Sequence, residues 1–177
     1  MRHVVLSGPS GVGKTTIANR LIQEGICERN ISCTTRPKRE YEVDGYDYDF
    51  VTESTFLDMI DQGKFAEHKK IFSHYYGTPR KRIEQAKKPL LFVVDVDGML
   101  SLKKSGVPIV SLFIAPPNLE SLRQRLLSRG TNTEQEIQTR VERAAYEMEK
   151  SSLYDHLFIN DDLDVCYKKV KEFILQS

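Results

Sequence analysis

A run of small and basic residues near the N-terminus has the spacing of a phosphate-binding loop. The segment reads G-x-x-x-x-G-K-T, follows a short apolar run that ends at Ser7, and leads at once into an amphipathic helical pattern. Glycines let successive backbone N–H groups converge on a phosphate chain, and the N-terminus of the following helix adds partial positive charge there. Lys14 would reach the outer phosphates, and the Thr15 hydroxyl would bind the Mg²⁺ that bridges them. The motif predicts a nucleoside triphosphate site formed by Gly8, Pro9, Ser10, Gly11, Val12, Gly13, Lys14, Thr15 and Thr16.

Two acids after an apolar run could complete this site. The run from Leu90 to Val96 predicts a buried parallel strand with Asp95 at its end, and a P-loop fold holds an acid facing the magnesium at such a strand end. Asp97 lies two residues further on, so it is expected on the same side of the strand. The alternative is that both acids are solvated residues at the edge of a strand.

The elements that would position these residues alternate between strand and helix. This order predicts an α/β fold with a parallel sheet flanked by helices on both faces. The expected strands are 2–7, 90–96, 107–115 and 156–160, and the expected helices are about 14–24, 118–128, 133–150 and from 162 onward. A polar stretch at 32–49, a short helix at 52–63, strand-like pieces at 64–78 and a helix at 79–87 interrupt the order. The 177 residues therefore read as one domain, with a P-loop core (1–31 and 89–177) and an inserted mixed α/β lobe (about 32–88).

Composition excludes several classes of protein. With 26 Lys and Arg against 25 Asp and Glu, the net charge is +1, so no nucleic acid is expected as a partner. Cys27, Cys33 and Cys166 lack C-x-x-C spacing and suit a reduced compartment. No apolar run approaches the about 18 residues of a membrane span, and the first strand begins too early for a signal peptide. We expect a cytoplasmic protein without a membrane partner. The four histidines lack metal-ligand spacing, which predicts structural roles for them: His3, His68, His74 and His156.

Several further segments occur in an order typical of one enzyme family. They are Gly8–Thr16, Ser32-x-Thr34-Thr35-Arg36-Pro37-x-Arg39, Glu42-Val43-Asp44-Gly45-x-Asp47-Tyr48-x-Phe50, Gly63-x-Phe65-x-Glu67, Tyr75-Tyr76-Gly77-Thr78, Ile114-Ala115-Pro116-Pro117, Arg125 with Arg129-Gly130-Thr131, Arg140, and Asn160-Asp161-Asp162-Leu163-Asp164. In this combination the chain resembles the guanylate kinases over essentially its whole length. The resemblance implies transfer of the γ-phosphate of ATP to GMP, with Mg²⁺ as cofactor.

The resemblance places the acceptor nucleotide on the inserted lobe. Arg36 and Arg39 would clamp its phosphate, because the planar guanidinium forms paired charge-assisted hydrogen bonds with phosphate oxygens. The alternative without a functional role is that Arg36 and Arg39 are exposed arginines on a solvated turn. The other residues implied to bind GMP are Ser32, Glu42, Tyr48, Glu67, Tyr76, Gly77, Thr78, Asp95 and Asp97.

Glu67 is the residue that the resemblance assigns to the base. Guanine presents N1–H and an amine as neighbouring donors, and a carboxylate can accept from both, whereas adenine presents an acceptor at N1 that a carboxylate repels. Thr78 would add a hydrogen bond to the same edge. Without its surrounding motif, Glu67 would read as an exposed surface residue.

Arg125, Arg129 and Arg140 resemble the family's lid arginines, within a helical lid at about 123–147. Arginines on a closing flap can neutralise the transferring phosphoryl group and exclude water. Arg123 and Arg143 read instead as a solvated helix face, and Asn160 would contact the adenine of ATP. The chain departs from the family pattern at Met99, where a glutamine is usual, at Tyr41, where a glycine is common, and at His68, which replaces a tryptophan. These departures bear on rate and affinity rather than on identity.

Other functions remain as alternatives. A guanylate-kinase-like protein-binding module typically loses the P-loop lysine, whereas this chain keeps Lys14. A related small-molecule kinase, such as one acting on a ribose phosphate, would not need Glu67, Thr78 and the Tyr48–Tyr76 pair together. A GTPase would carry an N-K-x-D-type motif, which the sequence lacks. The choice between GMP and dGMP as acceptor, and between monomer and homodimer, stays open.

Overall fold

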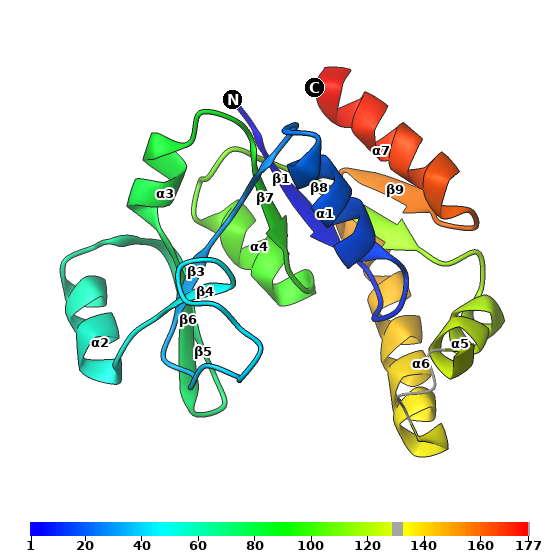
Figure 1. Cartoon of the computed structure of the whole chain (residues 1–177), viewed down its shortest axis with the longest axis horizontal. Coiled ribbons are helices and arrows are strands. Elements are labelled where there is room, and N and C mark those ends of the chain that lie inside the picture. The colour runs from blue at the N-terminus through cyan, green and yellow to red at the C-terminus, as the bar shows by residue number, and fades with distance from the viewer. Residues whose placement is uncertain (129–132, 177) are drawn as a thin grey trace.

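The computed structural model describes residues 1–128 and 133–176, and a five-stranded sheet forms its centre (Figure 1). Its strands lie in the order β2-β7-β1-β8-β9, and every neighbouring pair is parallel. The strands are β1 (His3–Ser7), β2 (Glu28–Arg29), β7 (Leu90–Val93), β8 (Ile109–Ala115) and β9 (His156–Ile159).

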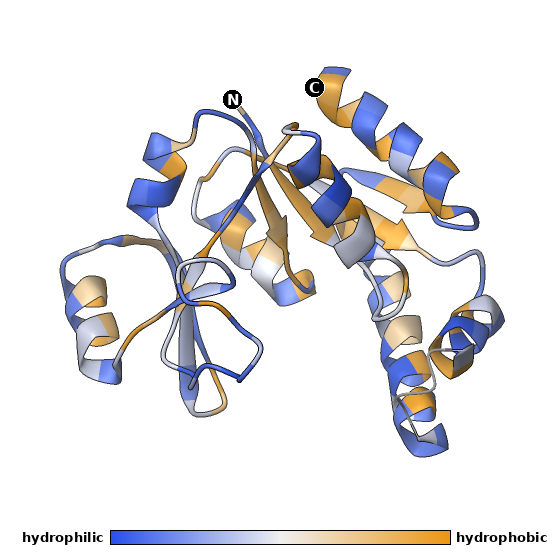
Figure 2. Cartoon of the chain, viewed as in Figure 1, coloured by the Kyte–Doolittle hydropathy of each residue, from blue (hydrophilic) through white to orange (hydrophobic). Residues whose placement is uncertain are grey.

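The two faces of this sheet enter separate apolar clusters. Val4 and Leu6 of β1 point to one face and Val5 to the other, because successive residues of a strand alternate. Residues of α1 (Lys14–Gln23), α5 (Leu119–Ser128), α6 (Glu134–Glu149) and α7 (Leu163–Gln176) join the first cluster, and residues of α3 (Arg80–Gln85) and α4 (Val96–Lys104) join the second. Figure 2 shows the central strands as apolar and the helices as apolar on one side. The expected α/β fold, with helices on both faces of a parallel sheet, is confirmed.

A second, smaller sheet lies to the left of the first in Figure 1. Its order is β4-β3-β6-β5, with β3 and β4 parallel and the other pairs antiparallel. The aromatic ring of Phe56, on α2 (Glu53–Asp61), stacks on Phe65 with 4.4 Å between ring centroids and covers one face of this sheet. The strands are β3 (Ser32–Thr34), β4 (Tyr48–Phe50), β5 (Phe65–Ile71) and β6 (His74–Pro79).

Local sequence signals set one end of each of three helices, α1, α2 and α6. The Thr52 hydroxyl accepts a hydrogen bond from the Thr55 N–H at the start of α2. Thr133 and Glu136 form a reciprocal capping box at the start of α6. Gly25 follows α1 with a φ of 68°, a left-handed conformation that glycine adopts without a steric penalty.

The strand expected to reach Val96 is shorter than the sequence suggests. β7 ends at Val93, and Asp95 is the N-cap of α4, its carboxylate accepting a hydrogen bond from the Gly98 N–H at 2.9 Å. Asp97 therefore lies in the first turn of a helix, and the expectation that Asp95 and Asp97 share one side of a strand is wrong. The alternation of strand side chains does not apply once the helix has begun.

Two smaller expectations also have clear outcomes. The apolar pattern of α7 predicts Val165, Cys166 and Val170 on its inner face, but Val165 is 51% exposed whereas the other two are buried. His3 is structural as expected, since its buried ring accepts a hydrogen bond from the Leu90 N–H through Nδ1. Within residues 1–128 and 133–176, no helix has the length and apolar character needed to cross a bilayer.

All three cysteines should resist thiol reagents in the folded protein. Cys27, Cys33 and Cys166 are free and buried, and burial raises the pKa of Cys27 and of Cys33 to about 11 and also raises the pKa of Cys166. The reactive thiolate is therefore scarce at pH 8. Ellman's reagent at pH 8 should label essentially no thiol in the native protein and three in guanidinium chloride. Rapid native labelling would contradict this burial.

Candidate active site

The phosphate-binding loop connects β1 to α1 at the carboxyl edge of the parallel sheet. Gly8, Gly11 and Gly13 all have positive φ values, of 142°, 90° and 99°. A Cβ at Gly8 would lie 2.1 Å from the backbone oxygen of Ile114, so β8 leaves room only for glycine there. The Lys14 ammonium donates hydrogen bonds to the carbonyl oxygens of Gly8 and Pro9. The loop is thus curled around its own lysine at the point where α1 begins.

A cavity of about 530 Å³ opens beside this loop. Gly8, Ser10 and Lys14 line one side of it, Asp95 lines another, and α6 closes it with Arg140 and Arg143. Arg140 donates a hydrogen bond from Nη1 to Ser10 Oγ at 2.8 Å, so the helix contacts the loop directly. Arg143, which the sequence favoured as a solvated residue, also lines this cavity, while its Nε donates to Glu147.

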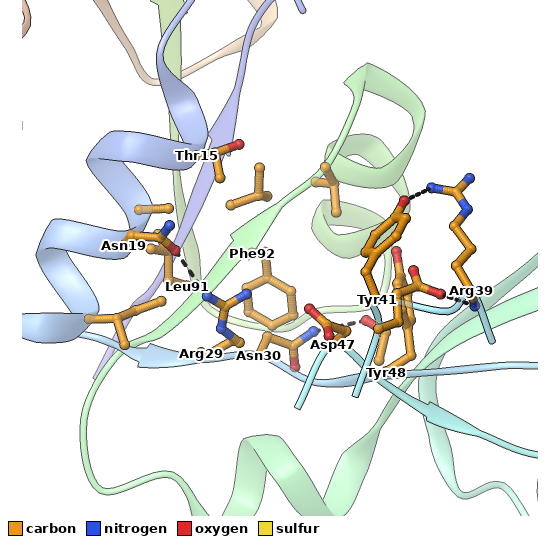
Figure 3. A pocket seen from close by; sticks show the side chains of 16 residues that line it. Thr15, Asn19, Arg29, Asn30, Arg39, Tyr41, Asp47, Tyr48, Leu91 and Phe92 are labelled. Carbon is orange, nitrogen blue, oxygen red and sulfur yellow. Dashed lines mark hydrogen bonds between the residues drawn. The ribbon is translucent and has the colours of Figure 1, made fainter. Parts of the chain in front are cut away.

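A second cavity, of about 350 Å³, lies between α1 and the small sheet (Figure 3). Thr15 reaches it from the core, and Ser32, Arg39 and Tyr48 reach it from the inserted segment. Sequence reasoning missed Arg29, whose Nη2 donates to Asn19 Oδ1 at 3.0 Å within this cavity. Ser32, Arg39 and Tyr48 therefore face the P-loop threonine across one space, whereas Arg36 does not line this cavity.

Glu42 holds the first arginine of this clamp. Arg36 donates to both carboxylate oxygens of Glu42, at 2.6 and 3.0 Å, and the Arg39 N–H donates to the same carboxylate at 2.8 Å. The hydrogen bond raises the pKa of Arg36 and lowers the pKa of Glu42, so both stay charged at neutral pH. Tyr41, one of the departures from the family pattern, accepts a hydrogen bond from Arg39 Nη1 at 2.9 Å.

A third cavity, of about 200 Å³, lies on the inner face of the β5–β6 hairpin. Glu67 pairs with Thr78 across the two strands, and the Thr78 hydroxyl donates to Glu67 Oε1 at 2.8 Å. Tyr76 and Gly77 line the same cavity, and the Tyr76 ring contacts the Tyr48 ring with 6.2 Å between centroids. His68, the neighbour of Glu67, is exposed on the other face of β5.

One short segment joins the three cavities. Val93 and Val94, at the end of β7, line all of them, and Asp95 lines the P-loop cavity and the hairpin cavity. Asp97 is exposed and lies outside the three, in the first turn of α4. The carboxyl ends of parallel strands are where α/β folds bind ligands, which agrees with this position.

Asn160 and Arg125 line a further cavity beside the P-loop. Asn160 is buried, donates from Nδ2 to the Val12 carbonyl oxygen at 2.7 Å, and lines a cavity of about 330 Å³ with Gly11, Thr16 and Arg125. Arg125 donates to the Asp161 carbonyl oxygen at 2.9 Å and does not line the cavity that holds Lys14 and Arg140. Arg129, the third expected lid arginine, lies outside the described residues.

The comparison with family models decides the relationship. The model described as guanylate kinase matches residues 1–177.

The chain belongs to the guanylate kinase family.

Individual guanylate kinases agree with this match over nearly the full chain. Guanylate kinase of Rickettsia bellii is 41% identical over 178 residues, covering 98% of this chain and 93% of the relative. Guanylate kinase of Novosphingobium aromaticivorans is 41% identical and covers 96% of this chain and 79% of the relative. The crystal structure of guanylate kinase from Anaplasma phagocytophilum superposes with a TM-score of 0.73 at 30% identity, covering 99% and 85% of the two chains. The family and the fold expected from the sequence are confirmed.

Proposed function

We propose that this guanylate kinase binds ATP at the P-loop cavity and GMP across the clamp and hairpin cavities, and transfers the γ-phosphate between them. The observation that carries the proposal is the wall at Val93–Val94, which is common to the three cavities that Arg39, Lys14 and Glu67 line. A phosphoryl donor and an acceptor must lie in line and close together, and catalysis is then largely positioning and charge neutralisation.

On the donor side, the backbone N–H groups of residues 8–16 cradle the ATP phosphates, and Lys14 neutralises the outer ones. Thr15 and Asp95 supply a hydroxyl and a carboxylate, hard oxygen ligands that suit Mg²⁺. Among the described residues, no cluster of three or more His, Cys, Asp or Glu could hold a metal alone. This agrees with an ion that arrives with the nucleotide and takes most of its ligands from phosphates and water. When bound, Mg²⁺ neutralises charge on the transferring phosphate.

On the acceptor side, Arg36 and Arg39 bind the GMP phosphate with the hydroxyls of Ser32, Tyr48 and Tyr76. Glu42 acts through Arg36, because the paired hydrogen bonds fix the guanidinium plane before the substrate arrives. Glu67 accepts from guanine N1–H and the amine, and Thr78 holds that carboxylate in place.

The lid residues complete the proposal. Arg140 already reaches the P-loop through Ser10 and would neutralise the transferring group, and we keep Arg125 and Arg129 as lid arginines that approach on closure. Asn160 would contact adenine beside its contact with Val12. Residues 32–88 would form the GMP lobe and 123–147 the lid of a single domain, acting as a monomer or homodimer in the cytoplasm.

A panel of acceptors tests the proposal. With ATP and Mg²⁺, the protein should phosphorylate GMP, and dGMP with similar or lower efficiency, far better than AMP, CMP or UMP. Excess EDTA should abolish turnover, because the phosphate charge is then left without its ion. Turnover followed by coupled ADP detection measures this, with a matched Mn²⁺ rescue as the control. Turnover of AMP at the level of GMP, or full activity in EDTA, would overturn the assignment of the site.

A further inference from the structure

The inner face of β5 carries a lysine beside the base-reading glutamate. Glu67, Lys69 and Ile71 alternate along the strand and line the hairpin cavity together, whereas His68 and Lys70 are exposed. The Lys69 side chain is only 26% exposed, and its ammonium lies 3.4 Å from Asp95 Oδ1. Among the described residues that line this cavity, Lys69 is the one cation, and Glu67 and Asp95 are carboxylates in the same lining.

Glu67 leaves one acceptor of the purine edge without a donor, and the hydroxyls of Ser32, Tyr48 and Tyr76, which also line this cavity, are assigned above to the GMP phosphate. Next to N1–H, guanine carries the acceptor O6, and a carboxylate cannot donate to it. The Thr78 hydroxyl has a single hydrogen, which it donates to Glu67 Oε1. An ammonium has three hydrogens, so Lys69 can contact Asp95 and still present two to a ligand.

We propose that Lys69 is a second specificity-determining residue, donating a hydrogen bond to O6 of the guanine base. Lysine is a frequent partner of O6 and N7 of guanine in other recognition sites, because both atoms accept. In adenine, position 6 carries an amine. Both this amine and the Lys69 ammonium are hydrogen-bond donors, so no hydrogen bond would form between them. Lys69 and Glu67 together then read neighbouring positions of one edge, and Asp95 holds the ammonium at the mouth of the cavity. The inference rests on the proposed placement of GMP.

Removing the ammonium from Lys69 should weaken GMP selectively. Lys69→Met should lower kcat/KM for GMP by about 10–150-fold, the range expected for a hydrogen bond to a charged group. Lys69→Arg keeps a cationic donor and should stay within a few-fold of the wild type. Lys70→Met removes the same charge from the next residue, whose ammonium lies 4.6 Å from the centroid of the Tyr75 ring on the outer face, and should have little effect.

The acceptor atom is tested with 6-thio-GMP, which keeps N1–H and the amine but carries a weakly accepting sulfur at position 6. Lys69→Met should lower its kcat/KM at least three-fold less than that of GMP, and calorimetric binding should give the same order. Circular dichroism melting should confirm that each variant is folded, and Lys69→Gln, which keeps a neutral donor, should fall between the wild type and Lys69→Met.

Two results would overturn the inference. Equal losses for GMP and 6-thio-GMP would mean that Lys69 acts through Asp95 rather than on the base. Equal effects of Lys69→Met and Lys70→Met would mean that Lys69 contributes only its positive charge and not a hydrogen bond to the base. A wild-type protein that fails to phosphorylate GMP would instead remove the proposed function, and the inference with it.

Discussion

Lys14→Met should lower kcat by at least ~10²–10³, the loss typical when one preorganised charge is removed from a developing transition state. The ammonium lies inside the curl of the P-loop, where it donates to the carbonyl oxygens of Gly8 and Pro9. In the proposed site it would contact the outer phosphates of ATP, where charge develops during transfer. GMP binding measured by calorimetry should survive within a few-fold, because the clamp and hairpin cavities lie outside the P-loop cavity.

The control for this variant is Lys168→Met, which removes an equal charge from the exposed side of α7. It should leave kcat and both nucleotide affinities near the wild-type values. Steady-state turnover at saturating GMP and a range of ATP concentrations gives the comparison. Near-normal turnover of Lys14→Met would contradict the assignment of the P-loop to the catalytic site.

Glu67→Gln should lower kcat/KM for GMP by roughly 10–150-fold, the range for a hydrogen bond to a charged group. Thr78 donates to one carboxylate oxygen, so in the variant it should keep the amide oxygen and leave the NH₂ group facing the base. That amide can donate to adenine N1, and its oxygen can accept from the adenine amine. AMP should therefore lose less than GMP or improve, while the affinity for ATP stays unchanged.

The measurement is kcat/KM for each monophosphate at saturating ATP and Mg²⁺, in the wild type and the variant. Glu84→Gln, which neutralises an exposed carboxylate on α3, is the matched control and should behave as the wild type. Equal losses for AMP and GMP would show that Glu67 does not read the base.

The features that could be predicted from the sequence depend on short-range patterns of residues. The glycine spacing of the P-loop, the Thr52 cap and the Thr133–Glu136 capping box each depend on residues within a few positions of one another. The helix α4 escaped prediction because the apolar run continues past the end of β7, with Val94 and Val96 extending the strand pattern into the cap of α4. Periodicity does not separate a strand end from a helix start over so few residues.

The family pattern marked candidate site residues in the sequence. It did not indicate the positions of residues that depend on how helices and strands pack against one another. Arg143 reads as solvated from its helix and its side chain is 68% exposed, but it also lines the P-loop cavity, because α6 packs with Ala144 buried against the core. Lys69 had a signal that was not used: it lies two residues from Glu67 on a strand, and so on the same face. Arg125 matched the motif of a lid arginine, but its position depends on how α5 sits beside Asp161, which no local pattern contains.

The shared wall at Val93 and Val94 has a consequence for inhibitor design. Adenosine and guanosine joined through a phosphate chain would occupy the donor and acceptor cavities at once, so the second half would bind at the effective concentration set by the linker. Affinity should be highest at one number of bridging phosphates and fall on either side of it. A shorter chain cannot reach both cavities, and a longer chain lowers the effective concentration of the second nucleoside. A series of such compounds that differ only in linker length would measure the span between the two nucleosides in solution.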